Sequence, residues 1–309
     1  MLIIINPFAA EYTALIKWKI LENSLFFDKH SCKMHFVNGK KPSHQIIKKA
    51  LNNGEREFIA AGGDGTVNYL LNSLIKYSKF EIQREIKIGA IGIGSSNDFH
   101  KPFTSLKRDQ IPIKINFEEA KLRDVGYLKF TNDEKSITKY FLINASIGLT
   151  ADANNLFNNP DKILRRLKQN NTALSIYYAA LKTILSYRNL SAELDCNIKG
   201  KSKTKITNLG IVKSPYFSGD LRYNSSINFD NGFIDVHLCE NLSKANSLFL
   251  LWALGHNKLN KVSKLKSWKT NQFSVSADKP FTVEYDGETI KTKAVEFGIL
   301  KKQINVCIS

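Results

Sequence analysis

The first third of the chain alternates short apolar runs with segments whose apolar residues recur every three or four positions. The apolar runs predict strands over residues 2–5, 32–37, 58–61 and 86–91. The periodic segments predict helices over residues 10–25, from residue 42 onward, and from Val67 onward. Strands that alternate with helices are typical of a mostly parallel sheet. We therefore expect an α/β domain over residues 1–121.

From residue 122 the pattern changes to short alternating segments separated by turn residues, which is typical of antiparallel sheets. The predicted strands are Val125–Phe130, Tyr140–Ala145, Leu190–Ile198, Ile206–Val212, Phe233–Leu238, Phe273–Ala277 and Phe281–Tyr285. Two helical stretches interrupt them, around Lys162–Tyr187 and Lys244–Leu259. The pattern predicts a second domain over residues 122–297, an antiparallel β-sandwich with inserted helices. The last segment, about residues 298–309, can return to the first domain.

Composition narrows the choice of partners. The chain has 309 residues and a formal net charge of +17, which favours anionic partners. Of the 45 basic residues 37 are Lys. Specific recognition of nucleic acid favours Arg, whose guanidinium group forms paired hydrogen bonds, so we expect no specific nucleic acid partner. Four well-separated cysteines indicate free thiols in a reducing cytoplasm. The N-terminus has no secretory pattern, and the strongest apolar run, Ser247–Leu254, is too short to span a membrane.

Three polar junctions follow predicted strands of the first domain. They are Asn6-Pro7, Gly62-Gly-Asp-Gly-Thr66 and Gly94-Ser-Ser-Asn-Asp98. Ligands of α/β sheets bind outside the carboxyl ends of the strands, and glycine amides before a helix N-terminus favour phosphate. The alternative is a tight turn in which Thr66 or Asp64 caps a helix that starts at Val67. Capping explains one polar residue but not three glycines, so we favour a phosphate site.

The glycine loops lack the Lys of a Walker loop and the spacing of a dinucleotide fingerprint. With the motifs around them, they resemble the diacylglycerol kinase catalytic domain family, which includes bacterial lipid kinases and the sphingosine and ceramide kinases. Besides the three junctions, the matching stretches are Asp124-Val-Gly126, Asn144-Ala-Ser-Ile-Gly148 and Tyr285-Asp-Gly-Glu288. The resemblance covers nearly the whole chain.

The resemblance implies an enzyme that transfers the γ-phosphoryl group of ATP, with Mg²⁺, to the hydroxyl of a lipid alcohol such as diacylglycerol or a sphingoid base. The reaction would take place in a cleft between the two domains. The implied ATP site comprises Asn6, Gly62, Gly63, Asp64, Gly65, Thr66, Asn68, Gly94, Ser95, Ser96, Asn97 and Asp98. Glu288 matches the proton acceptor, Asp286 lies beside it, and Asp64 lies near the Mg²⁺ of ATP. Taken alone, Asp286-Gly287 is a hairpin-turn signal.

Three positions depart from the family pattern. Ala9-Ala10 stands where the family has a small Gly after the opening Asn-Pro. Tyr69 stands where the family usually has an acid. At Asp230-Asn231-Gly232, some bacterial members carry two acids that hold a structural Mg²⁺, and Asn231 replaces one of them here. An amide oxygen can still coordinate a hard cation but without a full charge, so we expect at most a weak Mg²⁺ site at Asn231.

Two other functions stay open from the sequence. An enzyme like NAD kinase shares the Gly-Gly-Asp-Gly-Thr loop, although Asp286-Gly-Glu288 favours the lipid group. A nucleotide-binding regulator without catalysis is the other, and retention of Asp64 and Glu288 argues against it. Basic and apolar residues mix over Lys162–Lys168 and Lys244–Lys269, which predicts transient peripheral binding to an anionic membrane. The sequence allows a homodimer without specifying the oligomeric state.

Overall fold

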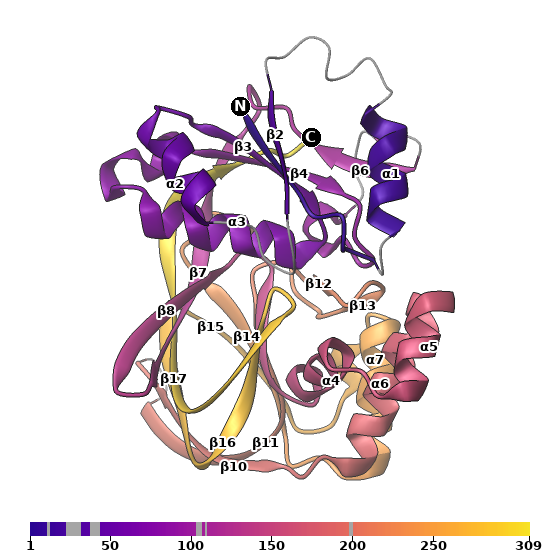
Figure 1. Cartoon of the computed structure of the whole chain (residues 1–309). Coiled ribbons are helices and arrows are strands. Elements are labelled where there is room, and N and C mark those ends of the chain that lie inside the picture. Colours follow the sequence, from indigo (N-terminus) through magenta and orange to yellow (C-terminus); the bar gives the residue numbers. More distant parts are fainter. Residues whose placement is uncertain (11–12, 23–31, 38–43, 103–106, 109, 198–199) are drawn as a thin grey trace. The chain divides into compact units, whose positions relative to one another are not determined.

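The computed structural model describes residues 1–10, 13–22, 32–37, 44–102, 107–108, 110–197 and 200–309 (Figure 1). The chain forms two compact units, Met1–Val125 with Lys301–Ser309, and Gly126–Leu300. The boundary lies close to the change of sequence pattern at residue 122. The prediction of a mixed α/β fold is confirmed.

Unit 1 is built on a sheet in the order β2-β1-β3-β4, in which all three neighbouring pairs are parallel. Its elements are β1 (Leu2–Ile5), α1 (Thr13–Glu22), β2 (Lys33–Phe36), α2 (His44–Asn52), β3 (Glu57–Gly62), α3 (Asp64–Tyr77), η1 (Phe80–Glu85), β4 (Lys87–Gly92), η2 (Asp98–His100), β5 (Lys107–Arg108) and β6 (Ile111–Lys114). Strand β6 pairs antiparallel with β4. The strands alternate with helices because each parallel pair needs a crossover.

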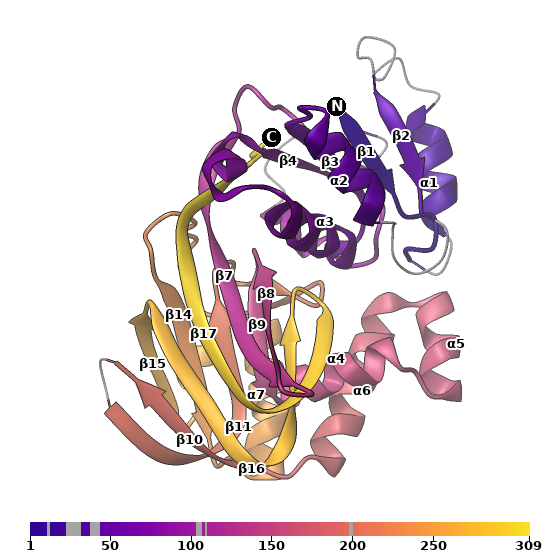
Figure 2. The same cartoon turned by 60° about the vertical axis from the view of Figure 1, so that its left-hand side comes forward.

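Helix α1 covers one face of this sheet, while α2 and α3 lie on the other (Figure 2). Trp18 of α1 is fully buried in a cluster with Ile3 and Ile5 of β1 and Ile59 of β3. Successive strand residues point to opposite faces, and Ile4, between Ile3 and Ile5, is also fully buried. Both faces are therefore covered, which explains why these strands read as continuous apolar runs.

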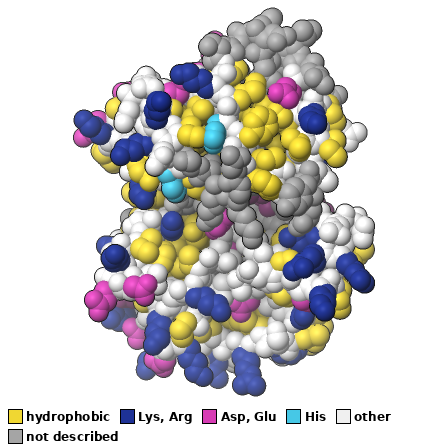
Figure 3. Space-filling model, in the orientation of Figure 1, with side chains coloured by type: hydrophobic (Ala, Val, Ile, Leu, Met, Phe, Trp, Pro, Cys, Tyr) yellow, Lys and Arg dark blue, Asp and Glu magenta, His cyan; other side chains and the backbone are white. Residues whose placement is uncertain are grey.

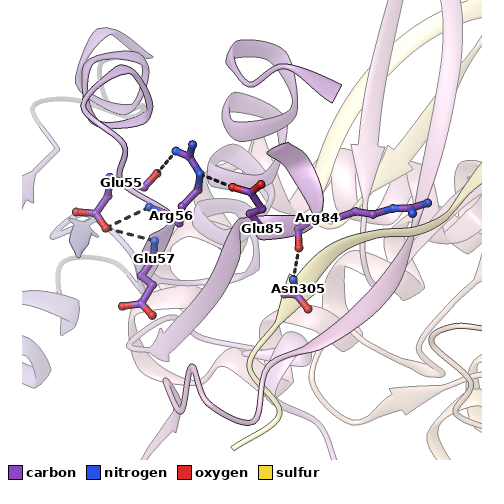
Figure 4. A network of polar contacts seen from close by, with 6 residues as sticks. All are labelled: Glu55, Arg56, Glu57, Arg84, Glu85 and Asn305. Carbon is purple, nitrogen blue, oxygen red and sulfur yellow. Dashed lines mark hydrogen bonds and ion pairs between the residues drawn. The ribbon is translucent and has the colours of Figure 1, made fainter. Parts of the chain in front are cut away.

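The last residues of the chain return to unit 1. Asn305 and its successor pair in parallel with the start of β4, and the Asn305 side-chain amide donates to the carbonyl oxygen of Arg84 (Figure 4). Beside this contact, Arg56 Nε donates to Glu85 at 3.1 Å, and Glu55 Oε1 accepts from the backbone of Arg56 at 3.3 Å. The polar network therefore ties the 3-10 turn η1, which precedes β4, to both β3 and the C-terminal strand.

Unit 2 is an antiparallel sheet with helices. Its elements are β7 (Lys121–Asn132, which begins in unit 1), β8 (Lys135–Phe141), β9 (Asn144–Gly148), α4 (Leu149–Asn158), α5 (Lys162–Asn170), α6 (Thr172–Ser186), β10 (Leu190–Cys196), β11 (Gly200–Val212), β12 (Tyr216–Phe217), β13 (Leu221–Arg222), β14 (Ile234–Glu240), α7 (Lys244–Gly255), η3 (Leu259–Lys261), β15 (Leu265–Thr270), β16 (Gln272–Tyr285) and β17 (Glu288–Val306, which ends in unit 1).

The strands of unit 2 share one apolar core. They follow the order β15-β14-β11-β10-β16-β17, and β9 pairs with both β11 and β16. Side chains of β7, β8, β9, β10, β11, β14, β16 and β17 meet in this core, with Phe141, Ile211 and Phe297 fully buried. A second cluster lies between the sheet and the helices, and α7 contributes Leu250 and Leu254 to it.

The structure corrects four details of the predicted elements in unit 2. The stretch 162–187 is two helices, because Asn171 has an extended backbone and its side chain accepts from the amide of Leu174. Helix α4 was not predicted. The stretch 140–145 is divided between β8 and β9, whereas 273–277 and 281–285 belong to one strand, β16, with a register shift. The predicted ends at residues 23–25, 42–43 and 198 lie outside the described residues.

Over the part of the chain that the structure describes, no helix combines the length and apolar character needed to cross a membrane.

Candidate functional site

The three junctions of unit 1 lie at the same edge of its sheet. Ile5 at the end of β1 is aligned with Ala61 of β3, and Gly62 at the end of β3 is aligned with Gly92 at the end of β4. The amide of Asn6 donates to the Ala61 carbonyl at 2.8 Å. Parallel pairing thus brings together the loops that follow β1, β3 and β4.

Glycine is required at two positions, at Gly62 because the loop folds back on its own Thr66 and at Gly94 because the two loops approach each other closely. A Cβ on Gly62 would lie 2.2 Å from Oγ1 of Thr66, and a Cβ on Gly94 would lie 2.3 Å from Cα of Gly63. The amide of Gly94 donates to the Gly62 carbonyl at 3.1 Å, and Asn6 Nδ2 donates to Oγ1 of Thr66 at 3.2 Å. The two glycine loops are therefore in direct backbone contact, and Asn6 is bonded to the first of them.

The carboxylate of Asp64 joins the same two loops. Its Oδ2 accepts from the amide of Asp98 at 3.0 Å, and its Oδ1 accepts from the amide of Phe99 at 2.9 Å. Burial raises the pKa of Asp64, and these two hydrogen bonds oppose that shift. Helix α3 starts at Asp64, with Gly63 in the N-cap position. The alternative in which Asp64 or Thr66 caps a helix that starts at Val67 is therefore wrong.

Asn97 shapes the second glycine loop. Its backbone is left-handed, with φ of 51°. Its Oδ1 accepts from the amide of Gly94 at 3.1 Å, and its Nδ2 donates to the carbonyls of Gly92 and Gly94 at 3.0 and 3.2 Å. Ser95 is exposed and Ser96 half-buried. The asparagine therefore fixes the loop, and the two serines between its bonds are accessible.

A buried ion pair follows this loop. Lys101 Nζ lies 2.9 Å from Oδ1 of Asp98, and both side chains are almost fully buried. His100 between them is also buried, and burial lowers its pKa to about 3. Breaking a buried pair leaves an uncompensated charge, so Asp98 and Lys101 depend on each other.

Sequence reasoning missed Lys17. Its Nζ donates to the carbonyl oxygen of Gly94 at 3.3 Å, so α1 carries a cation to the second glycine loop. Burial lowers the pKa of Lys17. The available signal was the helical period, because Lys17 lies three positions after Ala14 and four before Leu21, both on the buried face of α1.

Asn68 and Tyr69 lie in the first turns of α3. Asn68 is buried, and its Oδ1 accepts from Nδ2 of Asn72 at 3.1 Å. The Tyr69 hydroxyl lies 2.8 Å from Nδ1 of His44, and the two rings stack at 4.7 Å. The position where the family usually has an acid is thus a contact between α3 and the start of α2.

In unit 2, Asp286 and Gly287 form the two-residue turn between β16 and β17. Both have positive φ, 44° and 88°, which a type I′ hairpin turn requires. The Asp286 carboxylate is buried and accepts three backbone amides: Leu142 at 2.8 Å, Ile143 at 2.9 Å and Asn144 at 3.1 Å. These bonds account for the break between β8 and β9, since residues 142 and 143 bond to a side chain.

Glu288 is the first residue of β17 and is half-buried. The turn before it is fixed by Glu284, whose Oε1 accepts from the amide of Gly287 at 2.8 Å and whose Oε2 accepts from Ser146 Oγ at 2.8 Å. Asn158 of α4 donates to the Gly287 carbonyl at 2.7 Å. The unpredicted helix α4 and the buried Glu284 therefore hold the turn that presents Glu288.

Asn231 lies next to a buried ammonium. Its Oδ1 accepts from Lys213 Nζ at 3.2 Å and from the amide of Phe233 at 3.0 Å. Lys213 Nζ also donates to the Phe233 carbonyl at 2.8 Å. Among the described residues, no three His, Cys, Asp or Glu side chains are grouped so that they could hold a metal ion.

Comparison with known proteins agrees with this geometry. Residues 1–126 match the model of the diacylglycerol kinase catalytic domain. The resemblance to that family is confirmed. No curated protein sequence matches the chain.

Solved structures from Bacillus anthracis str. Sterne share the fold. A diacylglycerol kinase has a TM-score of 0.68 at 16% identity, covering 100% of this chain and 96% of that chain. Two proteins provisionally described as diacylglycerol kinases have TM-scores of 0.70 and 0.65 at 16% and 17% identity, covering 100% of this chain and 97% and 96% of theirs. The fold of these solved structures therefore extends over both units, and residues 1–126 are similar to the diacylglycerol kinase catalytic domain.

Proposed function

We propose that this protein is an ATP-dependent kinase that phosphorylates the hydroxyl of a lipid alcohol such as diacylglycerol or a sphingoid base. The observation that carries the proposal is the contact of the two glycine loops at the carboxyl ends of β3 and β4. A Cβ on Gly94 would clash with the backbone of Gly63, so this contact is possible only with glycine. Such loops let backbone amides approach phosphate oxygens closely.

The phosphates of ATP would be bound by the start of α3 and by Lys17. The first amides of a helix have no partner within the helix and carry partial positive charge. Lys17 adds a full positive charge at the Gly94 carbonyl. Magnesium bound with ATP would neutralise charge on the transferred phosphoryl group. Both Asp64 oxygens already accept hydrogen bonds from backbone amides. The main role of Asp64 would therefore be to hold the two loops together, and its place near the magnesium ion would be secondary.

The proton acceptor would be Glu288. In the reaction the lipid hydroxyl oxygen bonds to the γ-phosphorus, the bond from that phosphorus to ADP breaks, and the hydroxyl proton passes to a base. Glu288 is accessible at the end of its turn, whereas Asp286 is buried with three backbone amides on its carboxylate. We therefore propose that Asp286 holds the turn in position and that Glu288 accepts the proton of the lipid hydroxyl.

The decisive experiment is turnover of ATP by the purified protein with a panel of dispersed lipid alcohols and with NAD. We expect phosphate transfer to at least one lipid hydroxyl and none to NAD. Phosphorylation of NAD would favour the NAD kinase alternative. Binding of ATP with no turnover on any lipid, under conditions in which a known lipid kinase is active, would favour the regulator.

We propose an anionic membrane surface as the partner of helices α5, α6 and α7. Exposed apolar residues on α6 follow one stripe: Leu174, Tyr177, Leu181 and Leu185. Helix α6 contacts both α5 and α7, and α7 exposes Phe249 and Trp252. Helix α5 contains two Lys, two Arg and no acid, and dark blue side chains gather over it at the lower right of Figure 3. Apolar side chains rimmed by cations fit an anionic bilayer.

The structure changes which residues we expect to dock on the membrane. Of the residues 244–269, the first twelve form α7, while Lys266 lies in β15 and pairs with Glu240 at 2.6 Å. We therefore place docking on the helices rather than on the lysines after residue 260. The double variant Leu174→Gln, Leu185→Gln should lose most of its sedimentation with anionic vesicles, and neutral vesicles should sediment little of either protein. Phe80→Gln, which changes an equally exposed apolar residue of unit 1, should bind like the wild type. Equal binding of the double variant would rule out this face.

A further inference from the structure

We infer that the ammonium group of Lys213 is the resident cation of the turn at Asp230-Asn231-Gly232, so that this turn works without a divalent metal ion. The inference stands independently of the proposed kinase function. It concerns the position where the family resemblance implies a structural Mg²⁺.

The geometry supplies a cation at the oxygens that a metal would need. Lys213 follows directly after β11 and is only 3% exposed. Its Nζ lies 2.8 Å from the Phe233 carbonyl oxygen and 3.2 Å from Oδ1 of Asn231, both within the range of ordinary hydrogen bonds. The turn residue Asn231 therefore directs its side-chain oxygen to an ammonium.

A divalent ion at the same oxygens is disfavoured for two reasons. Mg²⁺ requires near-octahedral oxygen ligands at about 2.0–2.1 Å, whereas Asn231 Oδ1 already accepts from Lys213 and from the Phe233 amide. A buried ammonium would also repel a second cation strongly because the interior screens charge poorly. The amide at position 231 is consistent with this arrangement, since a single positive charge needs fewer carboxylates than Mg²⁺.

The ammonium also links the turn to the segment that Asp286 holds. The backbone amide of Lys213 donates to the Ile143 carbonyl at 2.9 Å, and the Ile143 amide donates to Oδ1 of Asp286 at 2.9 Å. Lys213 therefore connects the start of β14, through the end of β11, to the segment between β8 and β9. Loss of the ammonium is expected to loosen this part of unit 2.

The first test compares the wild-type protein, without nucleotide, in EDTA and in millimolar MgCl₂. We expect the same melting temperature in both, and no stoichiometric Mn²⁺ binding by electron paramagnetic resonance. A higher melting temperature in MgCl₂, together with a Mn²⁺ site that disappears in Asp230→Asn, would overturn the inference. This measurement needs no Lys213 variant, so it decides the question even if such a variant does not fold.

The second test removes the ammonium. Lys213→Met keeps an unbranched stem but leaves the Asn231 and Phe233 oxygens without this donor, so we expect the melting temperature to fall by on the order of 5 °C. Lys203→Met, at an exposed position of the same strand β11, should melt like the wild type. A melting temperature of Lys213→Met equal to that of Lys203→Met would contradict a role for the ammonium.

Discussion

Gly94 offers the sharpest test of the contact between the glycine loops, because Gly63 on the other side of that contact supplies a matched control. A Cβ on Gly94 would lie 2.3 Å from Cα and 2.9 Å from the backbone nitrogen of Gly63. A Cβ on Gly63 would lie 3.5 Å from Cα of Gly94, which is an ordinary contact. The same methyl group is therefore excluded on one loop and accommodated on the other.

The magnitude follows from these distances. Carbon atoms pack best at about 3.5–4.0 Å, so Gly94→Ala must separate two backbone segments by roughly 1.2 Å or more. Overpacking of this kind costs about 1–3 kcal/mol, and we expect the upper end because backbone atoms cannot change rotamer. Gly63→Ala should change the free energy of unfolding by less than about 1 kcal/mol, since Gly63 has φ of −94° and alanine adopts that region freely.

The assay is thermal unfolding of both variants beside the wild type, followed by titration with ATP. We expect Gly94→Ala to lower the melting temperature by roughly 5–10 °C and to weaken ATP binding, whereas Gly63→Ala should melt near the wild type. Two variants with equal melting temperatures would refute the close approach of the loops. If Gly94→Ala is destabilised but binds ATP as the wild type does, the contact between the loops is not needed for phosphate binding.

Three further predictions concern charged groups. Lys17→Met should weaken ATP binding by about 10–100-fold in a calorimetric titration because it removes a charge at the loop, while the exposed Lys19→Met on the same helix should not. Glu288→Gln should lower kcat by ~10²–10⁴-fold with little change in ATP affinity, whereas Asp286→Asn should mainly lower the melting temperature. The reverse pattern would make Asp286 the proton acceptor and Glu288 the residue that holds the turn. Burial lowers the pKa of His100 from 6.5 to about 3, so between these pH values only the unfolded chain binds this proton, and the free energy of unfolding falls as the pH drops below 6.5. Measured by urea titration, His100→Gln should reduce the dependence of this free energy on pH by up to about 1.4 kcal/mol per pH unit. An unchanged pH dependence would contradict a buried, neutral His100.

Local pattern alone was enough for the α/β character of unit 1 and for its three polar junctions. Apolar runs such as Leu2–Ile5 can be buried only in a covered sheet, and parallel strands bring their carboxyl ends to one edge. The glycines at 62, 63, 65 and 94 were informative because their conformational cost needs a reason. The Asp286-Gly287 turn was visible for the same reason, since positive φ at two successive positions restricts the choice of residues.

The roles of the individual polar side chains came only from the tertiary structure. Asp64 and Asp286 stand in motifs that suggest chemistry, yet both carboxylates accept backbone amides from segments 34 and 142–144 positions away in the chain. Helix α4 has only Leu149 and Ala151 buried, so its apolar period is too weak to predict. Lys17 lies in no motif.

What the sequence by itself determined is where the parallel strands of unit 1, the helices between them and the turns with special backbone requirements occur, because those depend on neighbours within a few positions. The partners of a buried carboxylate, of a closely packed glycine or of a buried ammonium come from segments that meet only after folding. Lys213 and Asn231 are 18 positions apart, and only the pairing of β11 with β14 brings the ammonium to the amide oxygen. The tertiary structure therefore decided how each loop is held, since the sequence does not show which residues far apart along the chain become neighbours in space.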